Sequence, residues 1–220
     1  MTAPLAMLLE KIANNPHIQV CKNDLPADVK FPHGMVAVDT ETLGLNPLRD
    51  RLCVAQVSDG DGNVWLVHFD GTDYSAPNLK KILIDPTLLK IFHYARFDIA
   101  VLKHYLGVET APLYCTKIAS KLTRTYTDAH GLKALCQELL DVKLDKYQQT
   151  SHWGADELSD AQQRYAASDV FYLVELKKIL DERLKQTNRT ALANQCFAFL
   201  PARAELDLAG WPETDIFAHR

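Results

Sequence analysis

The stretch MVAVDTETLGL, residues 35–45, constrains the fold and chemistry of this chain more than any other. The apolar residues 35–38 are followed at once by Asp39, Thr40 and Glu41, a pattern typical of a buried strand that ends in acids at the rim of a sheet. Because side chains alternate across a strand, Asp39 and Glu41 point to one face and Thr40 to the other. Two neighbouring carboxylates repel each other, so the pattern indicates either solvated acids at a loop mouth or a cation site.

Composition sets broad limits. A chain of 220 residues, 47% of them hydrophobic, suits one sizeable domain over residues 1–220. The net charge of −4 gives no global basic field, so any nucleic-acid contact needs a local patch. Five scattered cysteines without a C-x-x-C spacing favour reduced thiols in a cytosol over disulfides or a zinc site. With no signal-peptide pattern and no membrane-length apolar run, we expect a cytoplasmic protein without a membrane segment.

Apolar runs predict strands at residues 17–21, 52–58, 64–69, 88–94 and 113–115. Helical spacing of apolar residues predicts helices at 6–13, 78–84, 97–106, 117–122, 131–140 and 159–187, and one more from residue 190. Strands grouped early, with helices between and after them, predict an α/β fold with a mixed central sheet flanked by helices.

Two further carboxylates stand on helix faces that should meet the core. Asp169 interrupts the apolar stripe of the predicted helix 159–187, with Tyr165 one turn before it, and Asp98 lies near the start of the predicted helix 97–106. An ionised carboxylate is costly to bury unless it is paired or bound to metal. Taken singly, Asp98 also fits a favourable place at a helix N-terminus and Asp169 also fits an arginine partner, so both explanations stay open.

Taken together, the four acids predict a metal centre. If Asp39, Glu41, Asp98 and Asp169 lie near one point, each pair repels by roughly 3 kcal/mol at an effective dielectric near 20, and two divalent cations cancel that charge. Oxygen ligands without a cysteine or histidine cluster favour Mg²⁺ or Mn²⁺ over zinc. Two such ions among carboxylates are used for in-line displacement at phosphorus.

Three blocks, VAVDTET, FHYARFD and YAASDVFYL, resemble the three exonuclease motifs of the DEDD superfamily. The spacing of Tyr165 and Asp169 resembles the tyrosine (DEDDy) subgroup, similar to ribonuclease D; the histidine subgroup would have a histidine where Arg164 stands. The runs CTKIASKLTRTYTD, DTETLGLNPLRDRLC and LDLAGWPETDIFAHR are more similar still to nano-RNase C, a compact ribonuclease D-like group that degrades very short RNAs. The resemblance extends from residue 17 to the last residue.

This resemblance implies an RNase H-like (DnaQ-like) exonuclease fold and 3′-to-5′ hydrolysis of short oligoribonucleotides, down to dinucleotides, to nucleoside 5′-monophosphates. By motif position, Asp39, Glu41, Asp98 and Asp169 would hold two Mg²⁺ or Mn²⁺ ions. Tyr165 would orient the attacking water rather than act as a strong base, since an unperturbed phenol titrates near pH 10. Glu41 would also hydrogen-bond the terminal 3′-hydroxyl.

Other residues are candidates for substrate contact. Leu45 matches a leucine that relatives wedge between the last two bases, although a core leucine in a loop fits equally. Thr40, His93 and Arg96 stand beside the expected metal ligands, and a core histidine is the alternative for His93.

A basic helix face is a further candidate. Lys117, Lys121 and Arg124 fall on one face of a predicted helix. A solvated face is the ordinary explanation, and a grip on the 5′ phosphate of a short RNA is the sharper hypothesis.

Differences from ribonuclease D bear on substrate and assembly. Cys115 and His152 replace the usual aspartates, but neither position is a metal ligand. The helical repeats that follow the ribonuclease D catalytic domain have no counterpart, which argues against long structured precursors as the main substrate. Residues 190–220 carry much apolar area. That segment either packs on its own domain or, as the ring-like octamer of nano-RNase C implies, joins copies into a homo-oligomer.

Two rival functions stay open at this level. The same chemistry on longer RNA or on DNA is one, because discrimination of the 2′-hydroxyl rests on pocket geometry. The other is a non-catalytic nucleic-acid-binding module, which the intact set of four acids and the tyrosine disfavours.

Overall fold

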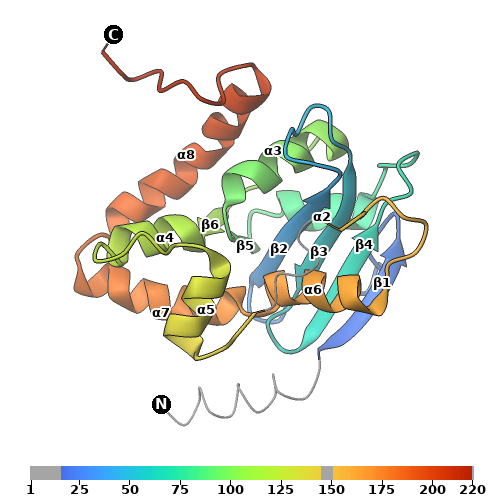
Figure 1. Cartoon of the computed structure of the whole chain (residues 1–220), viewed down its shortest axis with the longest axis horizontal. Helices are drawn as coiled ribbons and strands as arrows, with labels where there is room; N and C mark the ends of the chain where they lie inside the picture. Colours follow the sequence, from blue (N-terminus) through green and yellow to red (C-terminus); the bar gives the residue numbers. More distant parts are fainter. Residues whose placement is uncertain (1–15, 145–150, 220) are drawn as a thin grey trace.

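The computed structural model describes residues 16–144 and 151–219. Six strands form one mixed sheet in the order β1-β4-β3-β2-β5-β6, with helices on both faces (Figure 1). The strands are β1 (His17–Lys22), β2 (Met35–Thr42), β3 (Leu52–Ser58), β4 (Asn63–His68), β5 (Leu89–Phe92) and β6 (Leu113–Cys115). The helices are α2 (Pro77–Ile84), α3 (Ala95–Leu106), α4 (Thr116–Thr123), α5 (Leu132–Leu140), α6 (Asp160–Phe171), α7 (Leu173–Gln186) and α8 (Thr190–Leu208).

The sheet confirms the predicted α/β class and explains the apolar pattern of its strands. β3 pairs antiparallel with both β2 and β4, and all seven of its residues are buried. β2 runs parallel to β5 on its other side. A strand covered on both faces reads as a continuous apolar run, which is the pattern of residues 52–58. The predicted strands are confirmed to within a few residues, and the predicted helix at 6–13 lies outside the described residues.

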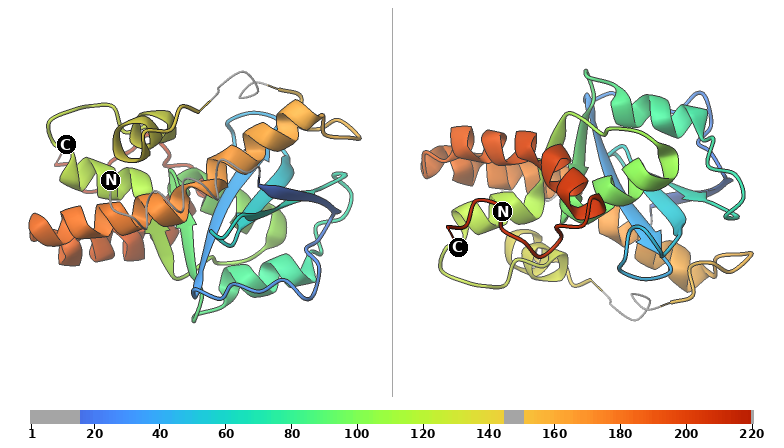
Figure 2. Two further views of the ribbon diagram at one scale, coloured as in Figure 1. Left: turned by 90° about the horizontal axis from the view of Figure 1, so that it is seen from below. Right: turned by 90° about the horizontal axis from the view of Figure 1, so that it is seen from above.

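Helices cover the two faces unequally. Seen along the sheet, α6 lies on one face and α2 and α3 on the other (Figure 2). α8 packs on α3 and β6 at the far end of the sheet, and α7 packs on α4, α5 and α8. The acids of β2 therefore lie between α6 on one side and α3 on the other.

The prediction of one helix over residues 159–187 is wrong at Tyr172, where α6 ends and α7 begins. No glycine or proline marks this break in the sequence. α6 packs on β2, β3 and β4, whereas α7 packs mainly on other helices, so tertiary packing rather than local propensity sets the break. The start of α6 is as predicted: Ser159 and Gln162 form a reciprocal capping box.

All five cysteines are free. None of the helices in the described ranges is long and apolar enough to cross a membrane.

Candidate active site

A cavity of about 630 Å³ opens where β2 ends. Its walls come from β2 and the loop after it, the first turns of α3 and α4, the start of α5, the loop before α6, and α6 itself. All four predicted acids and Tyr165 line it. The hydrogen-bonding register of β2 with β3 shifts between Glu41 and Thr42, a bulge of the kind that often accompanies functional sites at strand ends.

Three carboxylates meet on the α6 side of β2. Asp39, Glu41 and Asp169 each offer one oxygen, and these oxygens lie within 4.8 Å of one another. The alternation of side chains along β2 puts the first two on one face, and α6 brings the third to them. Such a group of carboxylate oxygens suits a hard divalent cation such as Mg²⁺.

Asp98 reaches the same cavity from the other face of β2. It stands in the first turn of α3 with 3% of its surface exposed, and its Oδ1 accepts a hydrogen bond of 2.7 Å from Thr40 Oγ1. Thr40 does point away from Asp39 and Glu41, as the alternation predicts, and in doing so it anchors the fourth acid. Asp98 is not among the three acids whose oxygens lie within 4.8 Å of one another.

Burial and mutual repulsion hold protons on these acids. Burial, then the charges of Asp98, Asp169 and Glu41, raise the pKa of Asp39 well above its usual range. The pKa of Glu41 is raised by burial and by Asp169 and Asp98. Burial raises the pKa of Asp98 and of Asp169 to about 7, while hydrogen bonds from Thr40 and Tyr165, respectively, oppose these shifts. Bound cations would remove this repulsion and let all four groups ionise.

Tyr165 lies one turn before Asp169 on α6, and its phenol is strongly held in the neutral form. Burial, followed by the charges of Asp169, Glu41 and Asp39, raises the pKa of the hydroxyl well above its usual range. Its ring packs against Trp153, with 6.0 Å between ring centroids. A neutral hydroxyl is able to donate or accept a hydrogen bond but has little capacity as a base at neutral pH.

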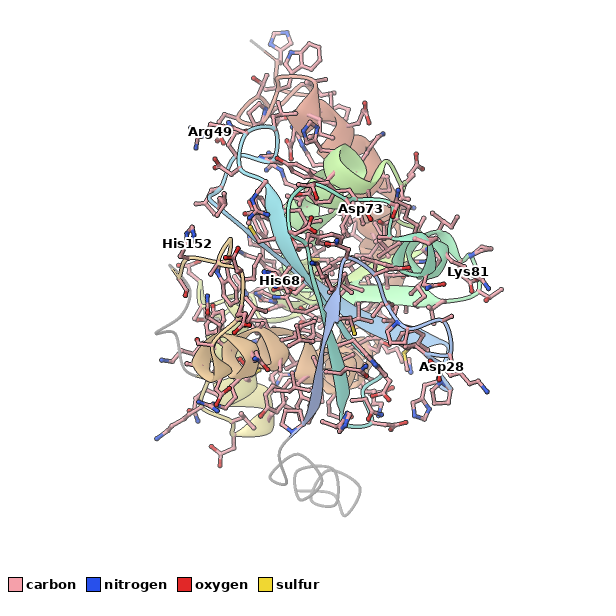
Figure 3. All side chains as sticks on the ribbon, turned by 90° about the vertical axis from the view of Figure 1, so that its right-hand side faces the viewer. Asp28, Arg49, His68, Asp73, Lys81 and His152 are labelled. Carbon is pink, nitrogen blue, oxygen red and sulfur yellow. The ribbon has the colours of Figure 1, made fainter. Side chains whose placement is uncertain are left out.

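The loop that carries Trp153 is held by side chains at the ends of β3 and β4. Arg51 donates to the carbonyl oxygens of Phe69 and Gly154, at 3.3 and 3.2 Å. Figure 3 views the sheet from its β1 edge, with His68 at the end of β4 on the same side as the loop that carries His152. Burial lowers the pKa of His68, and hydrogen bonds to the main chain of Ala155 and Trp153 oppose that shift. The loop before α6 is thus fastened to β3 and β4.

Three predicted substrate-contact residues line the cavity beyond the acids and Thr40. Leu45 is 87% exposed, which contradicts the core interpretation of that leucine. His93 Nδ1 lies 2.8 Å from Thr116 Oγ1, and burial, helped by Lys117, lowers the pKa of the imidazole to about 3, so it is neutral. Lys117 lines the same wall.

The structure corrects the basic helix face. Arg124 is 1% exposed, and its guanidinium binds Glu138, Ser120 Oγ and the carbonyl oxygen of Ala129. It stands at the C-terminal cap of α4, where the chain turns back toward α5, so the side chain points into the fold. Lys121 is exposed but does not line the cavity.

Arg96 also differs from expectation. Its guanidinium makes a bidentate pair with Asp207 on α8, at 2.5 and 2.7 Å, and binds the carbonyl oxygen of Pro212. Arg96 joins α3 to α8 and does not line the cavity, which argues against the predicted substrate contact.

Sequence reasoning gave no role to two aromatic residues of the cavity wall, Tyr94 and Phe97. Both stand in the block FHYARFD beside Asp98, and that proximity was the available signal. The exposure of Tyr94 follows from the turn between β5 and α3, which no local pattern specifies.

A family model of 3′-5′ exonucleases matches residues 12–185. The chain belongs to the 3′-5′ exonuclease family. This exonuclease is 55% identical to Brucella melitensis NrnC in a solved structure of NrnC bound to pGG. The match covers 94% of this chain and 100% of the NrnC chain, with a TM-score of 0.90. A second NrnC structure, with bound Mg²⁺, is 55% identical over 93% of this chain and all of that one, with a TM-score of 0.89.

Ribonuclease D sequences are more distant relatives of the exonuclease. That of Haemophilus influenzae is 29% identical over 82% of this chain, and the solved ribonuclease D of Escherichia coli is 26% identical over 91% of it with a TM-score of 0.70. The chain spans 45% and 48% of these two relatives, so it spans about half of their length. These likenesses confirm the predicted exonuclease fold and the ribonuclease D-like group, and the NrnC likeness supports the use of a divalent metal.

The raised carboxyl pKa values predict that Mg²⁺ binding weakens as pH falls. With pKa values near 7, Asp98 and Asp169 hold protons at pH 6 that Mg²⁺ must displace. Titration calorimetry at pH 6 and pH 8 should show tighter binding at pH 8, by on the order of tenfold for each acid that titrates, with protons released at pH 6. An affinity that does not change between these pH values would contradict the assignment.

The raised pKa values of these acids also affect the free energy of unfolding of the protein when a chelator removes divalent metal. The folded protein binds more protons than the unfolded chain between about pH 4 and pH 7, so the acids lower the free energy of unfolding as pH rises through that window.

The burial of Arg124 predicts a structural role. Arg124→Ala should lower the free energy of unfolding in urea by about 2–3 kcal/mol, because it removes a buried side chain together with its hydrogen bonds to Ser120, Ala129 and Glu138, and Lys121→Ala should change it by less than about 0.5 kcal/mol. Equal effects of the two substitutions would restore the surface-patch interpretation.

Proposed function

We propose that this chain is a 3′-to-5′ exoribonuclease that hydrolyses short oligoribonucleotides, down to dinucleotides, to nucleoside 5′-monophosphates. The observation that carries the proposal is the meeting of Asp39, Glu41 and Asp169 within 4.8 Å at the end of β2, with Asp98 in the same cavity. A single-stranded 3′ end fits such an open, acid-lined cavity only if cations offset the negative charge of both partners.

In this proposal two divalent cations, Mg²⁺ or Mn²⁺, are held by Asp39, Glu41, Asp98 and Asp169. When bound, the ions supply water activation and charge neutralisation at the phosphate. Asp39 and Glu41 are held in register by β2, Asp169 is positioned by α6, and Asp98 is oriented by Thr40. Acids fixed by separate elements keep the site arranged before substrate arrives, which lowers the cost of reorganisation during reaction.

Tyr165 is proposed to orient the attacking water through its neutral hydroxyl. The raised pKa of that hydroxyl argues against a role as general base. Arg51 donates to the carbonyl oxygen of Gly154, next to Trp153, and the Trp153 ring packs against the ring of Tyr165 in the cavity wall. Leu45, His93 and Lys117 remain the proposed substrate contacts among the residues predicted from sequence.

The preference for short RNA is proposed from two observations. NrnC has been solved with bound pGG, and this chain covers 100% of that NrnC chain at 55% identity. The cavity of about 630 Å³ is also of a size that holds a few nucleotides rather than a duplex. We place the enzyme in the cytoplasm, which its free cysteines support.

We also propose a homo-oligomer whose copies meet through residues 190–220, with an octamer as the expected size. Support comes from large apolar side chains exposed on α8 and the segment after it. They are Leu192, Phe199, Trp211, Ile216 and Phe217. Exposed apolar area of this kind is typical of interaction surfaces.

Product analysis on a series of 5′-phosphorylated RNAs and DNAs, from dinucleotides to 20-mers, tests the function. The rate per enzyme should be highest on the shortest RNAs, and the products should be 5′-monophosphates released from the 3′ end. Asp39→Ala should lower kcat by at least about 1,000-fold and Tyr165→Phe by about 100-fold. Asp61→Asn, an exposed acid paired with His33, is the matched control and should retain activity.

Each other outcome of that series has a defined meaning. Faster cleavage of longer RNA or equal cleavage of DNA would favour the alternative substrates. Binding without turnover in any metal would indicate the non-catalytic module.

Sedimentation analysis tests the assembly. The native protein should sediment as one closed oligomer, and the double substitution Trp211→Ser and Phe217→Ser should shift it to smaller species, because it removes apolar area from the proposed contact. A native monomer would contradict the proposal.

A further inference from the structure

We propose that the ring of Tyr94 is a stacking platform for a base of the bound oligonucleotide. The ring would strengthen substrate binding and would take no part in the hydrolysis step. The inference rests on the proposed function, since it needs a nucleic-acid substrate in the cavity. It concerns a residue that the metal-binding set does not include.

The backbone of Tyr94 is the first observation. It has φ 71° and ψ 40°, the left-handed conformation, between the end of β5 and the start of α3. Asn23, Ala76, Asp141 and Asn188 are the other non-glycine residues with positive φ in the described ranges, and none of them is aromatic. Bulky residues rarely adopt this conformation, and strained positions of this kind gather at binding sites.

The tight turn accounts for the conformation but not for the residue type. Only His93 and Tyr94 separate β5 from α3, and α3 must start there to bring Asp98 to the cavity in its first turn. Glycine or asparagine would satisfy the same turn with less strain. A tyrosine at this position therefore indicates a use for its side chain.

The position of the ring is the second observation. Tyr94 is 46% exposed and lines the catalytic cavity, four residues before Asp98. Lys117 Nζ lies 4.2 Å from the ring centroid. An exposed aromatic ring with a cation at its face is a combination that suits single-stranded nucleic acid, in which an aromatic ring stacks on a base and a cation meets a phosphate.

The chemistry of the ligand follows from this pair. Every nucleobase offers an aromatic face, so the platform accepts different bases, while Lys117 requires an anion close to that base. A nucleotide unit satisfies both requirements. Leu45, 87% exposed on the same cavity, adds apolar area for the neighbouring base.

The test is a cycle of two changes: removal of the ring and removal of the base. Tyr94→Asn removes the ring but tolerates the left-handed backbone, and Tyr94→Phe keeps the ring. Substrates are a 5′-phosphorylated diribonucleotide and its versions with an abasic residue at the first or the second position. Tyr126→Asn, the same change at a tyrosine 67% exposed outside the cavity, is the control.

We expect Tyr94→Asn to raise KM for the intact dinucleotide by about tenfold or more with kcat changed less than about threefold. Tyr94→Phe and Tyr126→Asn should behave like the native enzyme. On the substrate that lacks the stacked base, Tyr94→Asn should cause no further loss, because coupled partners are not additive. Equal losses on all three substrates, no loss on any, or an equal loss in Tyr94→Phe would overturn the proposal.

A binding measurement separates this inference from the proposed function. The dinucleotide carries the fluorescent base 2-aminopurine at either position and is added with Ca²⁺ in place of Mg²⁺, so that the charge of the acids is offset without the ion that the proposed reaction uses. Stacking on Tyr94 should quench the fluorescence at one position, and Tyr94→Asn should abolish the quenching. Quenching without turnover in metal would keep the platform and reject the nuclease; turnover with no quenching that depends on Tyr94 would do the reverse.

Discussion

The concentration of negative charge at the end of β2 is the constraint on which this structure depends. Asp39, Glu41 and Asp169 present oxygens within 4.8 Å of one another, and all three are only partly exposed in the cavity wall, so desolvation adds to their mutual repulsion. Without cations, the acids relieve the repulsion by keeping protons near neutral pH. The rest of the fold therefore stabilises an arrangement that is unfavourable by itself and becomes favourable with a ligand of opposite charge.

Several contacts serve that purpose from outside the cluster. The buried strand β3 supports β2 along its length, and the Thr40 hydroxyl holds Asp98 on the opposite face. Arg51 fastens the loop that carries Trp153, and Trp153 packs on Tyr165. Removing one of these contacts would leave all four acids in the chain, but it would loosen their arrangement at the end of β2.

Much of this was predictable from local pattern, and the failures have physical causes. The strand ending in Asp39 and Glu41 and the cap of α6 at Ser159 follow from apolar period and capping chemistry. The break at Tyr172 and the inward turn of Arg124 do not, because packing between elements decides both. The exposure of Tyr94 depends on a backbone conformation that tyrosine seldom adopts, so no propensity rule finds it.

Side chains from both faces of β2 contribute to the site, so the site depends on the register of β2 in the sheet. The side chains of residues 39 and 41 point toward α6, and that of residue 40 points toward α3. The pairing of β2 with β3 keeps this alternation up to the bulge after Glu41. A single-residue insertion or deletion upstream in β2 would exchange the faces and send the acids toward α3. Spacing along this strand is therefore less free to vary in evolution than the identity of its apolar side chains.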